Sequence, residues 1–269
     1  MVQMLGTAEI EFAGSLTTPL FWAMHDPLYG DKLQNGSLFF LDAGQGVFGV
    51  TAAHVVTACL QDAEDPAFRQ CRVARHEATP FQINLRERVI ALHEGMDIAT
   101  LRFTAEEVKA INRTPLTGYQ RIWPPTLAVS DSWVTYAGWP GVGRRWISNN
   151  DLRFGLVTMA GKVSSAHEAC ISVVIERDEL QRVLGDRDMP EDFDFGGMSG
   201  GPCLRMVERA GLRGWVLAGV VFQGPNPSRD AAQSISGLEI LRIRPAHFIH
   251  ADGTLDVERW QHCTPPGQA

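Results

Sequence analysis

The chain has 269 residues, of which 45% are hydrophobic, so it can bury a sizeable core, unlike a disordered chain. Lysine and arginine total 24, aspartate and glutamate total 31, and the formal charge is −7. This acidic balance argues against nucleic acid as a general partner, because it provides no basic field to attract phosphates.

The five cysteines are widely spaced and include no C-x-x-C pair, so the sequence indicates neither a zinc knuckle nor a redox motif of that kind. Their odd number is typical of reduced thiols, and we expect a cytoplasmic protein. The first residues lack a signal-peptide pattern, and no apolar run is long enough to cross a membrane. We therefore expect no membrane association, and we expect neither a metal nor a cofactor.

The first half of the chain predicts an N-terminal arm followed by short strands. Residues 1–35 are mixed in character and are expected to lie as an arm on the main domain. Strands of a hairpin are predicted at 36–41 and 47–51, then a helical turn to residue 60, and later strands at 71–75, 81–84, 87–92 and 96–103. Thr104 and Glu107 predict a capping box for a short helix over 104–111.

Prolines mark residues 112–130 as a linker, after which a second run of strands begins. The predicted strands lie near 133–136 and at 156–163, 170–175, 202–207, 214–222 and 237–243, with a short helix at 256–260. Many short strands and little helix indicate an all-β barrel or sandwich in two halves. The predicted divisions are an arm (1–35), a first barrel (36–111), a linker (112–130), a second barrel (131–245) and a tail (246–269).

One segment, residues 196–202, combines a serine with four glycines and a closing proline. Glycines gather where the backbone needs a positive φ or a close approach to another group. A serine in such a loop suits acyl transfer, because its hydroxyl can attack a carbonyl while backbone N–H groups stabilise the oxyanion. A tight surface turn is the simpler alternative, and the loop alone does not decide between them.

A histidine and an aspartate elsewhere in the chain could activate Ser199. His54 follows a strand end and small residues that would expose its ring. Asp97 precedes an apolar strand, where a desolvated carboxylate needs a partner such as an imidazole N–H. Each also fits an ordinary role, His54 as a satisfied histidine and Asp97 as a cap at a strand start. Their occurrence in the order His, Asp, Ser favours a catalytic triad.

Three motifs resemble those of trypsin-like serine proteases. Residues 51–54 resemble T-A-A-H, residues 97–101 resemble D-[IL]-A-x-L, and residues 197–202 resemble G-x-S-G-G-P. Residues 136–140 and 158–164 resemble the second barrel of the bacterial branch, which includes the high-temperature-requirement proteases. The resemblance covers about residues 36–245.

This resemblance implies two six-stranded antiparallel β-barrels with the active site in the cleft between them. It implies His54 as general base, Asp97 as the group that orients it, and Ser199 as nucleophile. The N–H groups of Gly197 and Ser199 would form the oxyanion hole. The implied activity is hydrolysis of peptide bonds in protein or peptide substrates through an acyl-enzyme.

Two departures from the secreted members of the family fit a cytoplasmic enzyme. Met198 stands where those enzymes have an aspartate that pairs with a new N-terminus, so activation by N-terminal cleavage is not expected. Val55 stands where they have a disulfide cysteine.

By the same resemblance, Phe193 lies at the base of the substrate pocket with Asp194 beside it, and residues 221–224 pair with the substrate backbone. The substrate-binding residues implied are Phe193, Asp194, Phe222, Gln223 and Gly224.

Several other interpretations remain open. The barrel could be a catalytically latent or inactive interaction module, or an enzyme that an activating protein partner switches on by remodelling residues 176–198. An α/β-hydrolase-type esterase is a minor alternative, because G-x-S-x-G is followed by Asp230 and His247 in that fold's order. The sequence around His93 lacks the second histidine of a zinc-protease helix.

Overall fold

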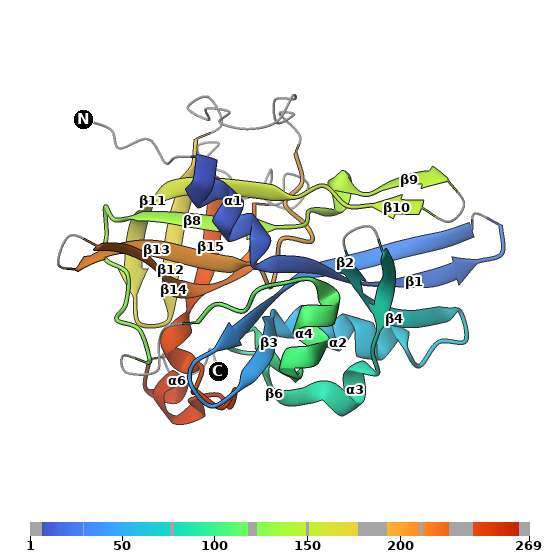
Figure 1. Cartoon of the computed structure of the whole chain (residues 1–269), viewed down its shortest axis with the longest axis horizontal. Helices are drawn as coiled ribbons and strands as arrows, with labels where there is room; N and C mark the ends of the chain where they lie inside the picture. Colours follow the sequence, from blue (N-terminus) through green and yellow to red (C-terminus); the bar gives the residue numbers. More distant parts are fainter. Residues whose placement is uncertain are drawn as a thin grey trace.

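The computed structural model places the chain in two β-rich halves that lie side by side (Figure 1). It describes residues 7–28, 30–75, 78–117, 123–148, 151–176, 193–209, 212–225 and 239–263. None of the helices in these ranges combines the length and the apolar character that a bilayer-spanning helix needs.

The first half is a seven-stranded antiparallel sheet in the order β5-β4-β1-β2-β3-β7-β6. Its strands are β1 (Thr17–Asp26), β2 (Gly30–Asp42), β3 (Val47–Thr51), β4 (Phe68–Arg75), β5 (Ala78–Gln82), β6 (Val89–His93) and β7 (Ile98–Arg102). In the described part of the chain, no pairing joins β5 to β6. The first half therefore has seven strands where a six-stranded barrel was expected, and the described residues do not show that the sheet closes into a barrel.

Residues 17–35, which the sequence suggested as part of an arm, instead form β1 and the start of β2 near the middle of this sheet. The first six residues of β1 are buried, because the strand has neighbours on both edges and packs on both faces. Its apolar run, centred on Trp22, is a central strand. Helix α1 (Thr7–Ser15) precedes it and contacts β8 and β11 of the second half, so the N-terminal segment spans both halves.

Short helices follow three of these strands. Helix α2 (Ala53–Asp62) begins directly after β3, and α3 (Leu85–Arg88) lies between β5 and β6. Helix α4 (Ala105–Ile111) begins at Thr104, whose hydroxyl accepts from the Glu107 N–H while the Glu107 carboxylate accepts from the Thr104 N–H. The predicted capping box is confirmed.

The second half is a closed six-stranded antiparallel barrel in the order β11-β12-β15-β14-β13-β8, as predicted. Its strands are β8 (Trp133–Gly138), β11 (Val157–His167), β12 (Cys170–Ile175), β13 (Pro202–Arg209), β14 (Leu212–Gln223) and β15 (Glu239–Pro245). A separate hairpin of β9 (Arg145–Ser148) and β10 (Asp151–Arg153) follows the short 3-10 helix Gly141–Gly143.

Residues after the barrel return to the first half. They form a 3-10 turn (Ala246–Phe248) and helix α6 (Val257–Cys263), where the sequence predicted a tail with a short helix. Trp260 of α6 is buried in a cluster that includes Phe39 and Phe48 of the first sheet and Leu217 of the barrel. This shared core fixes the two halves against each other.

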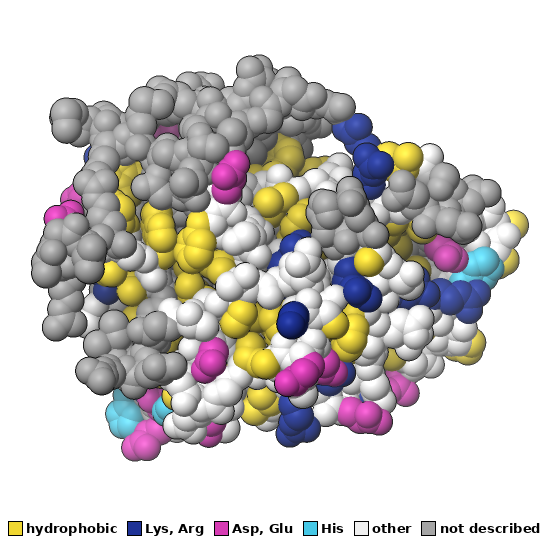
Figure 2. Space-filling model, in the orientation of Figure 1, with side chains coloured by type: hydrophobic (Ala, Val, Ile, Leu, Met, Phe, Trp, Pro, Cys, Tyr) yellow, Lys and Arg dark blue, Asp and Glu magenta, His cyan; other side chains and the backbone are white. Residues whose placement is uncertain are grey.

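Charged groups of both signs lie on the face shown in Figure 2, where lysine and arginine side chains are found among acidic ones over the lower and right-hand parts.

Candidate active site

The register of two neighbouring strands brings His54 and Asp97 together. Thr51 at the end of β3 lies opposite Ala99 in β7, so the residues just after Thr51 and just before Ala99 meet at one end of the sheet. His54 is in the first turn of α2, with a side chain 51% exposed, and Asp97, 18% exposed, ends the turn that leads into β7.

Both carboxylate oxygens of Asp97 accept hydrogen bonds from His54. The His54 backbone N–H donates to Oδ1 at 2.9 Å, and ring Nδ1 lies 2.7 Å from Oδ2. Because a carboxylate only accepts, Nδ1 is the nitrogen that carries the proton. In the neutral ring, Nε2 is then left with a lone pair and can act as a base.

The glycines around Ser199 have the backbone roles that the sequence suggested. Gly197 and Gly200 have φ of 98° and 88°, which favour glycine. A Cβ on Gly200 would lie 2.1 Å from the Ser37 carbonyl oxygen and 3.0 Å from the Ala52 backbone nitrogen. The residue after Ser199 thus touches the backbone two residues before His54, so the two predicted catalytic residues lie on adjoining segments.

Ser37 in β2 holds this loop, and the sequence analysis did not identify it. Its N–H donates to the Ser199 carbonyl oxygen at 2.8 Å, and its hydroxyl donates to the Gly197 carbonyl oxygen at 2.8 Å. The same hydroxyl accepts from the Trp139 N–H at 2.9 Å. Ser37 is fully buried, so a side chain of the first sheet fixes the serine loop of the second half.

Within the described ranges no hydrogen bond joins Ser199 to His54. The Ser199 hydroxyl donates weakly to the Phe222 carbonyl oxygen at 3.4 Å. The structure thus joins Asp97 to His54 directly and places the backbone beside Ser199 against the segment that leads to His54.

The two N–H groups expected to form an oxyanion hole are unoccupied by protein acceptors. Met198 N–H donates to the Phe195 carbonyl oxygen, and Gly200 N–H donates to that of Val221. In the described part of the chain, the N–H groups of Gly197 and Ser199 have no such acceptor.

The five residues expected to bind substrate are divided between the loop before Ser199 and the end of β14. The Asp194 carboxylate accepts from the Gly196 N–H at 2.8 Å, so it stabilises the turn. Phe193 packs edge-to-face against buried Phe195, with ring centroids 5.1 Å apart.

At the end of β14, the Phe222 ring lies under the guanidinium of Arg244. The Gln223 side-chain oxygen accepts from Arg242 at 3.3 Å. Gly224 lies against Phe195, where a Cβ would approach the Phe195 Cβ to 2.7 Å.

Of the other sequence candidates, Asp230 and residues 177–192 lie outside the described residues. His247 is buried beside Phe248, and His93 accepts from the Met96 N–H within the turn before Asp97. No group of three or more metal-ligating side chains occurs in the ranges that the structure describes.

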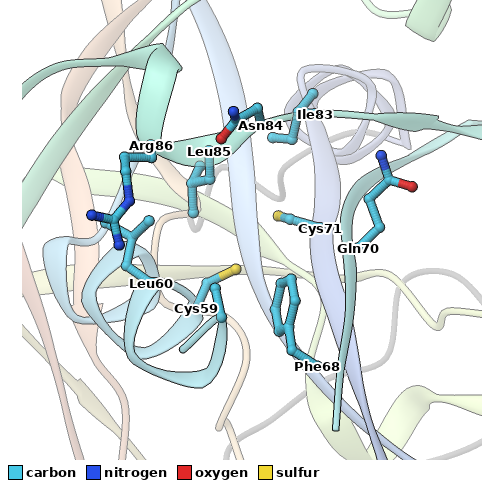
Figure 3. A pocket seen from close by; sticks show the side chains of 10 residues that line it. Cys59, Leu60, Phe68, Gln70, Cys71, Ile83, Asn84, Leu85 and Arg86 are labelled. Carbon is cyan, nitrogen blue, oxygen red and sulfur yellow. The ribbon is translucent and has the colours of Figure 1, made fainter. Parts of the chain in front are cut away.

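One open pocket in the described part of the chain is lined by none of the triad residues. It has a volume of about 340 Å³ and lies between the C-terminal part of α2, β4 and the segment that leads into α3 (Figure 3). The thiols of Cys59 and Cys71 face it together with apolar side chains. A hydrogen bond with the Cys59 thiol, and then burial, raise the pKa of Cys71, so the Cys71 thiol is a poor nucleophile.

No protein-family model matches the chain, and no curated protein matches it significantly. The function therefore has to be argued from the site itself.

Proposed function

We propose that the chain is a trypsin-like serine endopeptidase that cleaves peptide bonds through an acyl-enzyme. The observation that carries this proposal is the pair of hydrogen bonds from His54 to Asp97, formed where the Ser199 loop packs on the same sheet end. Under this proposal, the seven-stranded sheet is the counterpart of the family's first barrel. Five free cysteines support a reducing compartment such as the cytoplasm.

The proposed reaction has two steps. The Ser199 oxygen attacks the carbonyl carbon while His54 Nε2 takes the hydroxyl proton, and the oxyanion accepts hydrogen bonds from Gly197 N–H and Ser199 N–H. The intermediate collapses, the C–N bond breaks, and the proton on Nε2 passes to the leaving amine. A water molecule then attacks the acyl carbon while His54 Nε2 takes its proton. The bond between the acyl carbon and the Ser199 oxygen breaks, the proton on Nε2 passes to the Ser199 oxygen, and the carboxylic acid product leaves.

Rotation of the Ser199 hydroxyl would complete the triad. Its bond to the Phe222 carbonyl oxygen is long at 3.4 Å, so little is lost when it turns toward His54. Catalytic hydrogen bonds are often loose in free enzymes and shorten when substrate binds.

Substrate would bind along the end of β14 in an extended conformation. Backbone groups of Phe222, Gln223 and Gly224 would pair with it by strand addition, and Phe193 and Asp194 would border the pocket for the residue before the cleaved bond. The apolar ring of Phe193 supports a pocket without a trypsin-like aspartate at its base.

A catalytically latent barrel that serves as an interaction module is the second candidate. The missing His54–Ser199 bond in the described structure favours it. An activating protein partner would then have to reorient the serine loop.

An α/β-hydrolase is not supported, because the named strands pair antiparallel throughout the described ranges and Ser199 is followed by strand β13 rather than a helix.

Labelling with a fluorophosphonate probe tests the proposed function. We expect the wild-type chain to be labelled on Ser199 and S199A to be unlabelled, with peptide hydrolysis reduced roughly 10⁴-fold or more. S164A is the matched control, since the Ser164 hydroxyl lies on β11 and donates to a barrel carbonyl. Labelling only in a cell extract that supplies a partner would indicate latency. No labelling in either condition would overturn the enzyme proposal.

A further inference from the structure

Arg244 of β15 is a buried cation with no carboxylate bound to it. Only 6% of it is exposed, and in the described part of the chain no ion pair within 4.0 Å includes it. Burying a guanidinium without a bound counter-ion costs free energy of folding, so other contacts have to compensate for it.

Its donors hold the turn that presents Asp97. Nε donates to the Met96 carbonyl oxygen at 2.5 Å, and Nη1 donates to the Ala169 carbonyl oxygen. Asp97 follows Met96 and has φ of 55°, a left-handed conformation that costs free energy in a residue other than glycine. A clamp on the preceding carbonyl group stabilises this conformation.

The same guanidinium lies over two aromatic rings, and one of them belongs to the residue that accepts from Ser199. Its carbon lies 4.3 Å from the centre of the Phe222 ring and 4.4 Å from that of Trp260. The carbonyl group of Phe222 is the current acceptor of the Ser199 hydroxyl. Arg244 therefore contacts the residue before the acid and the residue bonded to the nucleophile.

The charge of Arg244 also acts on Asp97. Burial lowers the pKa of Arg244, and the charges of Cys170 and Asp97 oppose that decrease. Arginine nonetheless stays protonated at working pH. The ionisable groups that face the Asp97 turn are His54 from α2, Glu94 and His93 within the turn, and Arg244 from the barrel.

We propose that Arg244 is a positioning residue for the triad, which clamps the Met96–Asp97 turn and the Phe222 strand. This inference rests on the proposed function for its effect on rate. Its effect on the hydrogen bond between His54 and Asp97 does not require catalysis.

Three variants separate the hydrogen bonds of Arg244 from the space that its side chain fills between the two rings. R244M removes the donors and the charge but keeps an unbranched side chain that can fill the space between the two rings. R244K keeps the charge and loses the planar fork. R88M is the matched control, because Arg88 is also partly buried and stacked on a ring, Phe103, but is paired with Glu107 on the first half.

The experiment follows by NMR the proton on His54 Nδ1 that Asp97 accepts, with H54Q for assignment, and measures the fluorophosphonate labelling rate. In R244M, we expect this resonance to broaden or disappear, because a turn without its clamp holds the Asp97 carboxylate less firmly against the ring. Its labelling rate should fall about tenfold or more. R244K should keep the resonance and lose part of the rate, and R88M should match wild type in both.

Each outcome decides a separate point. An unchanged His54 Nδ1 proton resonance in folded R244M, or an equal change in R88M, would overturn the inference. If R244M does not fold, R244K decides, since a wild-type rate per folded molecule would exclude the clamp. If the wild-type chain is not labelled, the proposed function fails, while the NMR measurement still tests Arg244.

Discussion

The buried side chain of His247 has a pKa that can be tested by its effect on stability. His247 is 5% exposed, and its ring centroid lies 4.4 Å from that of Phe248. Burial, and then the charge of Arg259, lower the pKa of His247 to about 4, below the ordinary 6.5. Its imidazole is therefore neutral in the folded protein at any pH at which the fold is expected to function.

This lowered pKa predicts a loss of stability in mild acid. Above pH 6.5 the ring is neutral in both states and contributes no pH dependence. Between pH 6.5 and about 4 the unfolded chain binds a proton that the folded chain does not. The free energy of unfolding therefore decreases as the pH is lowered through this range, by about 3 kcal/mol in total. Urea unfolding at several pH values should show this slope reduced in H247Q and retained in H25Q, whose histidine is exposed. Equal slopes in H247Q and wild type would contradict it.

Among single residues, the sequence predicted His54, Asp97 and Ser199 as members of the site. It did not predict the roles of Ser37 and Arg244. The predicted residues lie in local motifs with small residues or apolar runs around them. The roles of Ser37 and Arg244 come from contacts with residues 160 and 148 positions away. No local pattern marks a strand serine or a strand arginine as a partner of a distant loop, so only the folded chain reveals them.

The neighbouring strands constrain the shape of the serine loop. The loop enters from the segment before β13, packs against β2, β3 and β8, and forms backbone hydrogen bonds with β14. A Cβ at Gly201 would lie 2.0 Å from the Ala137 carbonyl oxygen, and one at Gly200 would be almost as close to that of Ser37. Close backbone approach, more than turn geometry alone, accounts for the glycines of this loop.

G200A is therefore expected to cost about 3 kcal/mol or more, because it combines a positive φ with a clash against backbone. Two controls separate these causes. Gly46 has φ of 109° with open space around it, so G46A should cost about 1 kcal/mol. Gly214 has open space and no positive φ, so G214A should stay within about 0.5 kcal/mol. Urea midpoints rank the three variants, and G200A no worse than G46A would show that the loop can move.

Element boundaries were predictable where the signal is local, as for the capped helix α4, and not where it depends on neighbours. The apolar run before residue 26 lacks the alternation of a half-buried strand, and its position in the middle of the sheet is set by pairing with β2 and β4. Closure of a sheet likewise depends on long-range pairing. The second barrel matched the prediction, whereas the first half has seven strands.

The whole molecule is held together by both ends of the chain. Helix α1 packs on the barrel before β1 enters the first sheet. After β15, the chain leaves the barrel and returns to the first sheet, where the Gly253 carbonyl oxygen accepts from the Thr100 hydroxyl at 2.5 Å. The relative placement of the two halves therefore depends on segments outside the three motifs.

This arrangement predicts that the two halves unfold as one unit, with Trp260 as a main contributor. Trp260 packs on Phe248 and Arg244 and belongs to the cluster shared by both halves, so W260A should lower the free energy of unfolding by about 3–5 kcal/mol. W146A is the control, because Trp146 is 51% exposed and should cost less than about 1 kcal/mol. Hydrogen exchange at increasing urea should show peptides of β4 and β12 losing protection at the same midpoint, with W260A lowering both together. Loss of protection in only one half would mean that the shared cluster does not couple the two halves. One half could then unfold without the other.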